Sequence, residues 1–578
     1  MFIINLFYLI INIFFDFFNR FFVCHFNFWS IEGHFSLVVT SSNNRDIFTA
    51  LEVIKWATTD YFIVFGTYLG IYIEIFFIVS ILLLIIFFVI FDNLFQYKFI
   101  LSPNISYIFI LIFLLMSLLL NNIRGDLIIF DSMLIEDNLG IFVQNILIIN
   151  FILYIIISLN YIFCEKIVNY EYFLLLGLAF LGMITMVKCN DLISLYFAIE
   201  LQSLVFYIIA SFKIYTNFST EAGLKYFILG SFSSGILLFG CSLIYGFVGT
   251  TNFDYLHILF IDKIQNNIFI GFLLGIVFVI IGILFKVGAA PFHMWLPDVY
   301  EGVPTIVTAF FAIIPKIALF TLLYRLGVSF CASNFFFWNQ LFIYVALLSI
   351  VIGTLGGLYQ IKIKRLIAYS AISHTGFILI GYSSFTDFSI FATYVYILVY
   401  IVISFNIFAL LLSLRKRDNF LKLKKLNEFV VLFKSNSLLA INFCIILFSI
   451  AGIPPLLGFY SKFYIFFSAI KSNLYFVVFI SAILSVIASM YYIRLIKLMF
   501  FKKFKYWSFF FEITKCNSII ISLTLFFNIL FIFYSQTILI FIYNKIIFIA
   551  EIIEKAPVCH TCVIFVPHVT DITIKNLW

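Results

Sequence analysis

The sequence GILFKVGAAPFHMWLPDVYEGVPT, from Gly282 to Thr305, decides how the chain is interpreted. It begins as an apolar helix, yet it carries Lys286 among hydrocarbon side chains and then Pro291, which removes a hydrogen bond from the helical ladder. In a bilayer, irregular backbone is tolerated only where it is buried in protein or lines a wet cavity. A cation beside a helix break therefore indicates a polar interior within a membrane-embedded bundle.

The composition extends this interpretation to the whole chain. Of 578 residues, 64% are hydrophobic and only 11% are charged, and runs close to the 20 apolar residues of a membrane span recur along the sequence. The runs fall near 62–91, 105–120, 140–164, 172–188, 192–212, 222–249, 267–296, 303–326, 338–359, 366–384, 389–413, 437–467, 473–499 and 517–548. We predict an all-α polytopic membrane protein with about 14 transmembrane helices, plus an extra N-terminal hydrophobic segment. A membrane β-barrel is disfavoured because its strands would alternate polar and apolar residues.

A second broken segment, LFSIAGIPPLLGFYSKFYIFF, runs from Leu447 to Phe467. It contains two adjacent prolines and, after them, Lys462. Paired broken helices in the two halves of a chain are typical of inverted-repeat transporters, with the ion site at mid-depth. The breaks fall in predicted helices 7 and 12, which indicates antiporter-like repeats of helices 4–8 and 9–13. The predicted parts are 1–60 (an extension with a hydrophobic helix), 61–170 (helices 1–3), 171–326 (first five-helix repeat), 338–500 (second repeat) and 501–578 (last helix and tail).

Basic residues occupy alternate loops. They follow the ninth, eleventh and thirteenth runs, at Lys362, Lys364 and Arg365, at Arg415, Lys416 and Arg417, and at Lys502, Lys503 and Lys505. We expect these loops to share one side of the membrane, the matrix or cytoplasmic side by the positive-inside rule. Nucleic-acid binding is not expected, because no basic face has aromatic partners outside the apolar runs.

Ionisable residues within the apolar runs are the candidate site: Glu200, Lys225, Lys286, Lys316 and Lys462, with His374 as a further candidate. An ion at the bilayer centre costs roughly 3 kcal/mol on insertion scales. Removal from water favours the uncharged form of an amine, and a nearby carboxylate favours the charged form. Linked by waters, such a row can pass protons, and the helix breaks supply polar backbone groups to hold those waters.

Each residue also has a structural interpretation. Lys225 is close enough to a helix end to extend its amine to the membrane surface, and a purely structural ion pair would account for Glu200 and Lys316. His374 equally fits a hydrogen-bonded interior histidine. Glu74 is interpreted as a carboxylate at a helix end.

The segment FKVGAAPFHMWLPDVYEGVPTIVTAFFAIIPKIALF resembles the characteristic segment of the N-type subunits (subunit 2) of respiratory complex I, the proton-pumping NADH:ubiquinone oxidoreductase. KIKRLIAYSAISHTGFILIG and LFSIAGIPPLLGFYSKFYIF are similar to later motifs of that family. The resemblance implies a fold with broken helices 7 and 12. It also implies proton-pathway roles for Glu200 in helix 5, Lys225 in helix 6, Lys286 in helix 7, Lys316 in helix 8 and Lys462 in helix 12.

The same resemblance implies an organelle-encoded, multi-pass subunit of the mitochondrial inner membrane. Its partners would be other membrane-arm subunits, including antiporter-like neighbours, and phospholipids. Flavin, iron–sulfur clusters and quinone are expected in partner subunits, with no cofactor or metal in this chain; a single CxxC at Cys559–Cys562 is too little to predict a metal site. Two other functions stay open, a cation/proton antiporter subunit of related fold and a non-conducting structural scaffold.

Overall fold

The structure is a computed structural model that describes residues 70–89, 102–121, 127–165, 170–213, 216–261, 266–416, 423–502 and 510–547. The predicted extension, 1–60, and the tail with its CxxC therefore lie outside the described residues. The domain boundaries proposed from the sequence stay a prediction.

Helices dominate the described residues, with one short antiparallel hairpin, β1 (Leu127–Ile129) and β2 (Leu134–Glu136). The helices are Gly70–Val89, α3 (Ser102–Leu120), α4 (Asn138–Cys164), α5 (Tyr170–Lys188), α6 (Leu192–Ala210), α7 (Asn217–Val248), α8 (Phe253–Ile261), α9 (Asn266–Val287), α10 (Trp295–Gly302), α11 (Thr305–Leu358), α12 (Ile363–Ser384), α13 (Asp387–Ser413), the 3-10 helix η2 (Leu426–Val431), α14 (Leu432–Ser435), α15 (Ser437–Ala451), α16 (Leu457–Lys471), α17 (Tyr475–Phe501) and α18 (Lys515–Ile547).

Within the described residues, 11 helical stretches are long and apolar enough to cross a membrane, and α11 supplies two of them, Thr305–Phe330 and Phe337–Leu358. Three shorter apolar helices, Ile105–Leu120, Ser437–Ala451 and Lys515–Phe531, accompany them. The prediction of an all-α polytopic membrane protein is confirmed. The total of fourteen helices stays a prediction.

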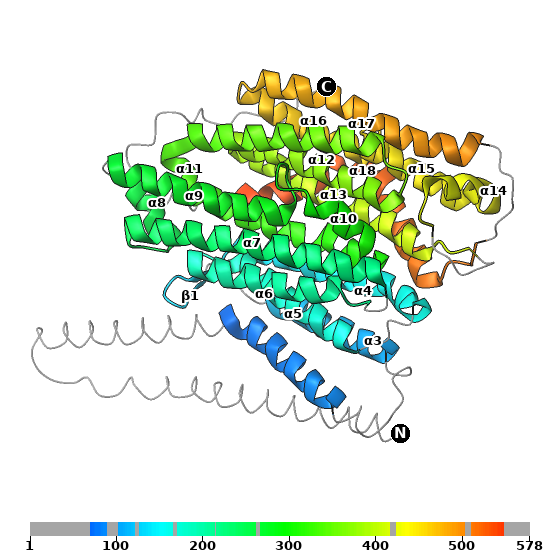
Figure 1. Cartoon of the computed structure of the whole chain (residues 1–578), viewed down its shortest axis with the longest axis horizontal. Coiled ribbons are helices and arrows are strands. Elements are labelled where there is room, and N and C mark those ends of the chain that lie inside the picture. Colours follow the sequence, from blue (N-terminus) through cyan, green and yellow to red (C-terminus); the bar gives the residue numbers. More distant parts are fainter. Residues whose placement is uncertain are drawn as a thin grey trace, which may run out of the picture. The chain divides into compact units, whose positions relative to one another are not determined.

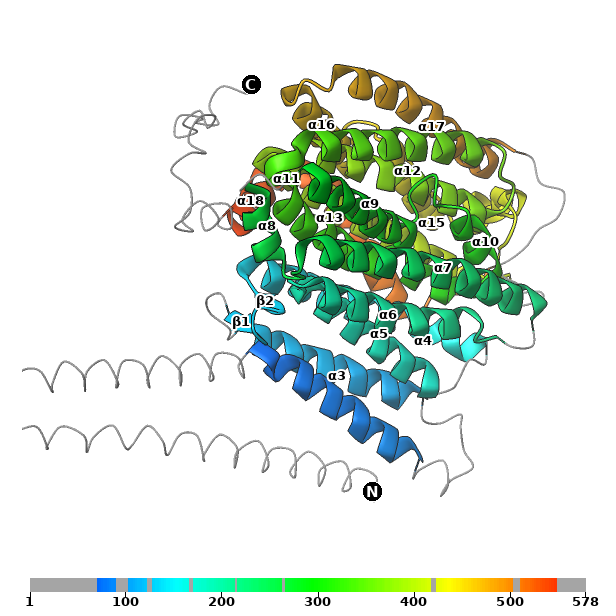
Figure 2. The same cartoon turned by 60° about the vertical axis from the view of Figure 1, so that its left-hand side comes forward.

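The first stretch of α11 forms the centre of the bundle. Its most apolar window is entirely buried, and it packs against α4, α5, α12 and α13. In Figures 1 and 2, α3, α5 and α6 lie on one side of α11–α13, and α17 lies on the other. A polar side chain on this part of α11 is thus removed from both lipid and bulk water.

The basic loops gather at one end of the bundle. A backbone bridge joins Lys362 to Lys425, another joins Lys416 to Phe510, and Lys502 donates to Asn427. The loops that follow α11, α13 and α17 therefore meet at one end, which confirms that the basic loops share a side. The β1–β2 hairpin and α8 lie at the other end of the helices (Figures 1 and 2).

Both predicted helix breaks are confirmed. Between α9 and α10 the backbone passes through Gly288, with φ of 80°, and a cis peptide bond before Pro291. The indole of Trp295 bridges this break by donating to the Phe285 carbonyl at 2.9 Å. Between α15 and α16 the chain passes through Gly452, with φ of 86°, and a cis bond before Pro455.

Gly452 has two reasons to be glycine. Its positive φ is a conformation that costs other residues roughly 1–2 kcal/mol, and a Cβ there would lie 3.0 Å from the Lys462 Nζ. We expect Gly452→Ala to destabilise the protein by about 1–2 kcal/mol and to displace the Lys462 amine. The measurement is the thermal inactivation temperature and the yield of assembled protein in membranes.

Gly235→Ala is the matched control. Gly235 lies within α7, and a Cβ at that position would meet no atom within 4 Å, so alanine there should be neutral or stabilising because of its higher helix propensity. A Gly452→Ala protein as stable as the Gly235→Ala control would contradict the assignment.

Candidate functional site

One face of α6 carries the first polar cluster. Glu200, Ser203 and Tyr207 are spaced i, i+3 and i+7, which places them on the same side of the helix. The Ser203 hydroxyl donates to Glu200 Oε2 at 3.1 Å, whereas Glu200 Oε1 is buried without a hydrogen-bond partner. Lys286, in the last turn of α9, donates to the Tyr207 hydroxyl at 3.1 Å. The structure thus brings Lys286 to the α6 face that carries Glu200.

A cavity of about 20 Å³ adjoins this cluster. A cavity must offer at least about 10–15 Å³ and several polar partners to hold a water molecule. By volume, this cavity has room for one water molecule. The lining includes Ser203, Lys286 and, from α11, Pro315. The first cluster therefore extends toward the part of α11 that carries the next lysine.

Lys316 follows Pro315 in the buried centre of α11 and is only 4% exposed. Its Nζ donates to the Tyr400 hydroxyl of α13 at 3.2 Å and lies 4.8 Å from the centre of that ring. Tyr400 in turn donates to the Ala312 carbonyl at 3.2 Å. The hydrogen-bond partner of the Lys316 amine is therefore a neutral hydroxyl group, which is itself bound to a neutral carbonyl.

Lys462 lies at the second helix break. Its Nζ donates to the carbonyls of Ile450 and Ala451, at 3.0 and 2.8 Å. These carbonyls belong to the last turn of α15, where helical carbonyls have no intrahelical partner. The break therefore supplies the acceptors that the amine needs.

A cavity of about 30 Å³ connects Lys462 with the α12 and α13 side chains. His374 of α12 lines it and shares a 2.6 Å hydrogen bond with Tyr396, while its ring lies 5.6 Å from that of Tyr400. By volume the cavity has room for one or two waters. The lining also includes Tyr400, Ser404, Ser449 and Ser461, so Lys316, through Tyr400, reaches the same cavity as His374 and Lys462.

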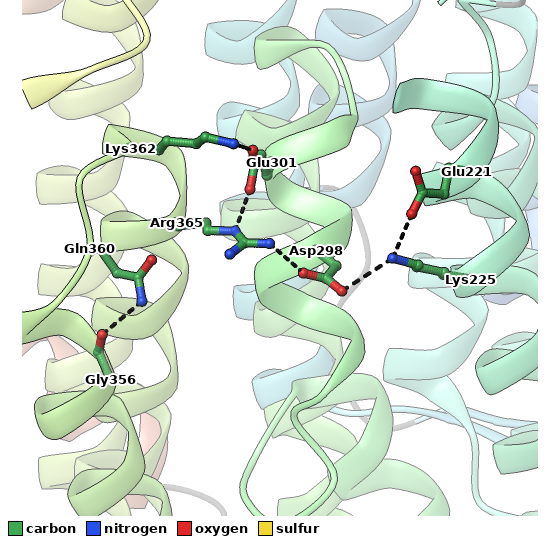
Figure 3. A network of polar contacts seen from close by, with 8 residues as sticks. All are labelled: Glu221, Lys225, Asp298, Glu301, Gly356, Gln360, Lys362 and Arg365. Carbon is green, nitrogen blue, oxygen red and sulfur yellow. Dashed lines mark hydrogen bonds and ion pairs between the residues drawn. The ribbon is translucent and has the colours of Figure 1, made fainter. Parts of the chain in front are cut away.

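Lys225 has different neighbours. Its side chain is 45% exposed and pairs with Glu221 at 2.7 Å and Asp298 at 3.4 Å. Asp298 also binds Arg365 at 2.8 Å, and Glu301 pairs with Arg365 and Lys362. Figure 3 shows this network, which joins α7, α10 and the start of α12 at the end of the bundle that carries the basic loops.

The tyrosines are the functional candidates that the sequence interpretation missed. Tyr207, Tyr396 and Tyr400 contact the lysines and the histidine through their hydroxyl groups. A signal was present, because Tyr207 lies on the Glu200 face of α6 and Tyr396 and Tyr400 are spaced i, i+4 on α13. A buried tyrosine hydroxyl usually has a hydrogen-bond partner, which makes such residues worth pairing with nearby lysines.

Within the described part of the chain, no group of three or more His, Cys, Asp or Glu residues is arranged to hold a metal ion.

Comparison with known proteins gives consistent results. Residues 189–488 match the family described as NADH:quinone oxidoreductase/Mrp antiporter, transmembrane. The chain is 44% identical over 408 residues to NADH-ubiquinone oxidoreductase chain 2 of Marchantia polymorpha, which covers 69% of this chain and 81% of that protein. It is 41% identical over 372 residues to NADH-quinone oxidoreductase subunit N of Rhodospirillum rubrum, which covers 64% and 76%.

Two solved structures share the fold. A chain of respiratory complex I from Thermus thermophilus with bound aureothin superposes with a TM-score of 0.65 at 23% identity, covering 82% of this chain and 98% of that one. A chain of the Mrp complex from Dietzia sp. gives 0.69 at 15% identity, covering 84% and 97%. These likenesses establish the antiporter-like fold, and the sequence identities establish the family: the chain belongs to the family of NADH-ubiquinone oxidoreductase chain 2 and its bacterial counterpart, subunit N.

Proposed function

We propose that this chain is a proton-translocating subunit in the membrane arm of respiratory complex I, and that protons cross it through the row Glu200, Lys286, Lys316, His374 and Lys462. Its partners are other membrane-arm subunits, and its membrane is the mitochondrial inner membrane. Electron transfer from NADH to ubiquinone takes place in partner subunits, which hold the flavin and the iron–sulfur clusters.

One observation carries the proposal: each cavity is lined by a lysine of the proposed row together with tyrosine and serine residues. A lysine ammonium can give its proton to a water, or to a hydroxyl oxygen that releases its own proton to a water in the same step, because both groups donate and accept hydrogen bonds. Tyr400 contacts the Lys316 amine and also lines the cavity shared by His374 and Lys462. Tyr400 therefore links the Lys316 amine to the cavity that Lys462 lines, and a water in that cavity would complete the route between the two lysines.

The step from Lys286 to Lys316 crosses α11. The first cavity ends at Pro315, whereas the Lys316 amine points to Tyr400 on the other side. We propose that a water or a rotation of the Lys316 side chain completes this step during turnover. Pro315 lacks an amide hydrogen and so leaves one helical carbonyl without its donor, which supplies an additional acceptor near the crossing.

Lys225 acts at the entrance of the row rather than within it. It is partly exposed at the end with the basic loops, and it shares Asp298 with Arg365. Because Asp298 belongs to α10, directly after the first break, a change in the charge of Lys225 would act on the broken helix. Redox energy released in partner subunits must supply about 2.3 kcal/mol for each proton moved against 100 mV.

The scaffold alternative predicts lysines held in dry contacts. The cavities beside Lys286 and Lys462 are each large enough for a water and are each lined in part by serine, tyrosine and lysine residues, which favours conduction instead. The antiporter alternative predicts a protein that works without redox partners. Purification of the intact assembly distinguishes the antiporter alternative from the proposal, because the proposal requires flavin- and cluster-bearing subunits to copurify with this chain.

Lys286→Met tests the first cluster. We expect the complex to assemble, because methionine retains the volume and apolar stem of lysine. Proton translocation coupled to NADH oxidation should fall by at least about tenfold. Positioned proton-transfer groups contribute roughly 10²–10⁴-fold to a rate, so tenfold is a lower bound. The measurement is proton translocation per NADH oxidised in proteoliposomes. Lys497→Met, which removes an exposed lysine of α17, is the control. An assembled Lys286→Met complex that pumps at the control rate would refute the row.

Tyr400→Phe tests the hydroxyl relay. It keeps the ring beside Lys316 and removes only the group that contacts the amine and the Ala312 carbonyl. We expect pumping to fall about fivefold, equivalent to the ~1 kcal/mol of one hydrogen bond, while assembly is preserved. Tyr344→Phe, at a tyrosine 65% exposed on α11, is the control. Equal pumping in the two variants would exclude Tyr400 from the route.

A further inference from the structure

Three charged side chains meet at the end of the bundle opposite the basic loops. Lys188, the last residue of α5, extends its amine between Glu74 of the helix Gly70–Val89 and Glu136 of β2. The Nζ lies 2.5 Å from Glu74 Oε1, is ion-paired with Glu136 Oε2, and donates to the Gly70 carbonyl at 3.1 Å. Lys188 is 1% exposed and Glu136 is fully buried.

The charges in this cluster do not balance. Two carboxylates and one ammonium leave one net negative charge, and a buried charge without a partner costs several kcal/mol. Asp137, the next residue along the chain, does not alter the balance because it has its own partner, Arg325, at 2.6 Å.

The hydrogen bonds are unbalanced in the same way. Gln144 of α4 donates to Glu136 Oε2 at 3.4 Å. Glu136 Oε1, Glu74 Oε2 and Gln144 Oε1 are buried without a hydrogen-bond partner. All three are acceptors, so the cluster lacks a donor. A proton on one carboxyl group would supply a donor and remove the excess charge at once.

We propose that Glu136 and Glu74, bridged by Lys188, form a proton-binding site that holds one proton, separate from the Glu200–Lys462 row. Loading the site forms one carboxyl O–H bond with a proton from water, and unloading breaks that bond and returns the proton to water. The Glu74 side chain is 10% exposed and gives the site its contact with the exterior. The proposal stands apart from the proposed function, because it depends only on this cluster.

The groups that face Glu136 act in opposite directions. Burial raises its pKa to about 7, and the nearby Glu74 adds to that rise, while the Lys188 ammonium and the Gln144 amide oppose it. From α4 the facing group is this amide, and β1 contributes only apolar residues, Leu127–Ile129. Because the acid form is the one favoured, the site is loaded below neutral pH and empties as the pH rises through about 7.

Infrared spectroscopy of the purified complex tests the site, because a protonated carboxyl group has its own carbonyl stretching band. We expect Glu136→Gln and Glu74→Gln each to lose one such group relative to the unmodified complex below neutral pH, where the site is loaded. In either variant the remaining carboxylate pairs one-to-one with Lys188, so the excess negative charge that the proton would neutralise is gone. The double variant should lose the same single group, since the two carboxylates share one proton.

Lys188→Met should change the spectrum in the opposite direction. Without the ammonium, whose charge favours the ionised form of Glu136, the carboxyl band of Glu136 is expected to persist to higher pH. Glu171→Gln, at an exposed carboxylate in the first turn of α5, is the matched control and should leave the band unchanged. If one glutamine variant fails to assemble, the other reports the same loss.

Two results would overturn the proposal. In the first, the single glutamine variants have the same band as the Glu171→Gln control, which would mean that both carboxylates are ionised. In the second, the double variant loses two groups, which would mean that each carboxyl holds its own proton.

Discussion

A lysine ammonium has three N–H donors, and within an apolar bundle each must find an acceptor that belongs to the protein or to a trapped water. This requirement organises the interior of the chain. Lys462 finds two carbonyls at the end of α15, Lys286 finds the Tyr207 hydroxyl, and Lys316 finds the Tyr400 hydroxyl. The helix breaks provide carbonyl acceptors for the lysine ammonium groups, the tyrosines provide hydroxyl acceptors, and the cavities provide space for water.

The breaks also determine where polar backbone is allowed. Carbonyls at the end of a half-helix are free to bind a cation only because the next half begins elsewhere, and the chain must turn sharply between them. Gly452 makes that turn with a positive φ and leaves space for the Lys462 side chain. The same residue therefore ends α15 and admits the cation to the carbonyls that this ending exposes. At the first break the link is different, since Trp295 joins the two halves through the Phe285 carbonyl.

Whether a contact of the candidate site can be predicted from the sequence depends on how far apart its residues lie along the chain. Proline and glycine next to lysine are local signals, so both breaks and their lysines could be predicted from short segments. The partner of Lys316 lies 84 residues away on another helix, and the packing that brings them together is not encoded in the hydropathy of either segment. Lys225 lies near a helix end and pairs with Glu221 and Asp298 at the end that carries the basic loops, and its role in the proton pathway stays a prediction. Glu74 was interpreted as a helix-end carboxylate because its partner, Lys188, lies more than a hundred residues further along.

The contrast between Lys188 and the interior lysines shows how the surroundings choose which group exchanges its proton. An ammonium between two carboxylates is stabilised in its charged form by both of them, so the proton that can be gained or lost belongs to the acid pair. Lys316 and Lys462 have hydroxyl and carbonyl oxygens as partners, which bind the ammonium without a full countercharge. Under the proposed function, the amine itself is there the group that exchanges its proton, and a charge that approaches through the cavity would shift its protonation equilibrium. The same residue type therefore has charged partners at one end of the bundle and neutral partners at its centre, and the proposed proton transfer depends on that difference.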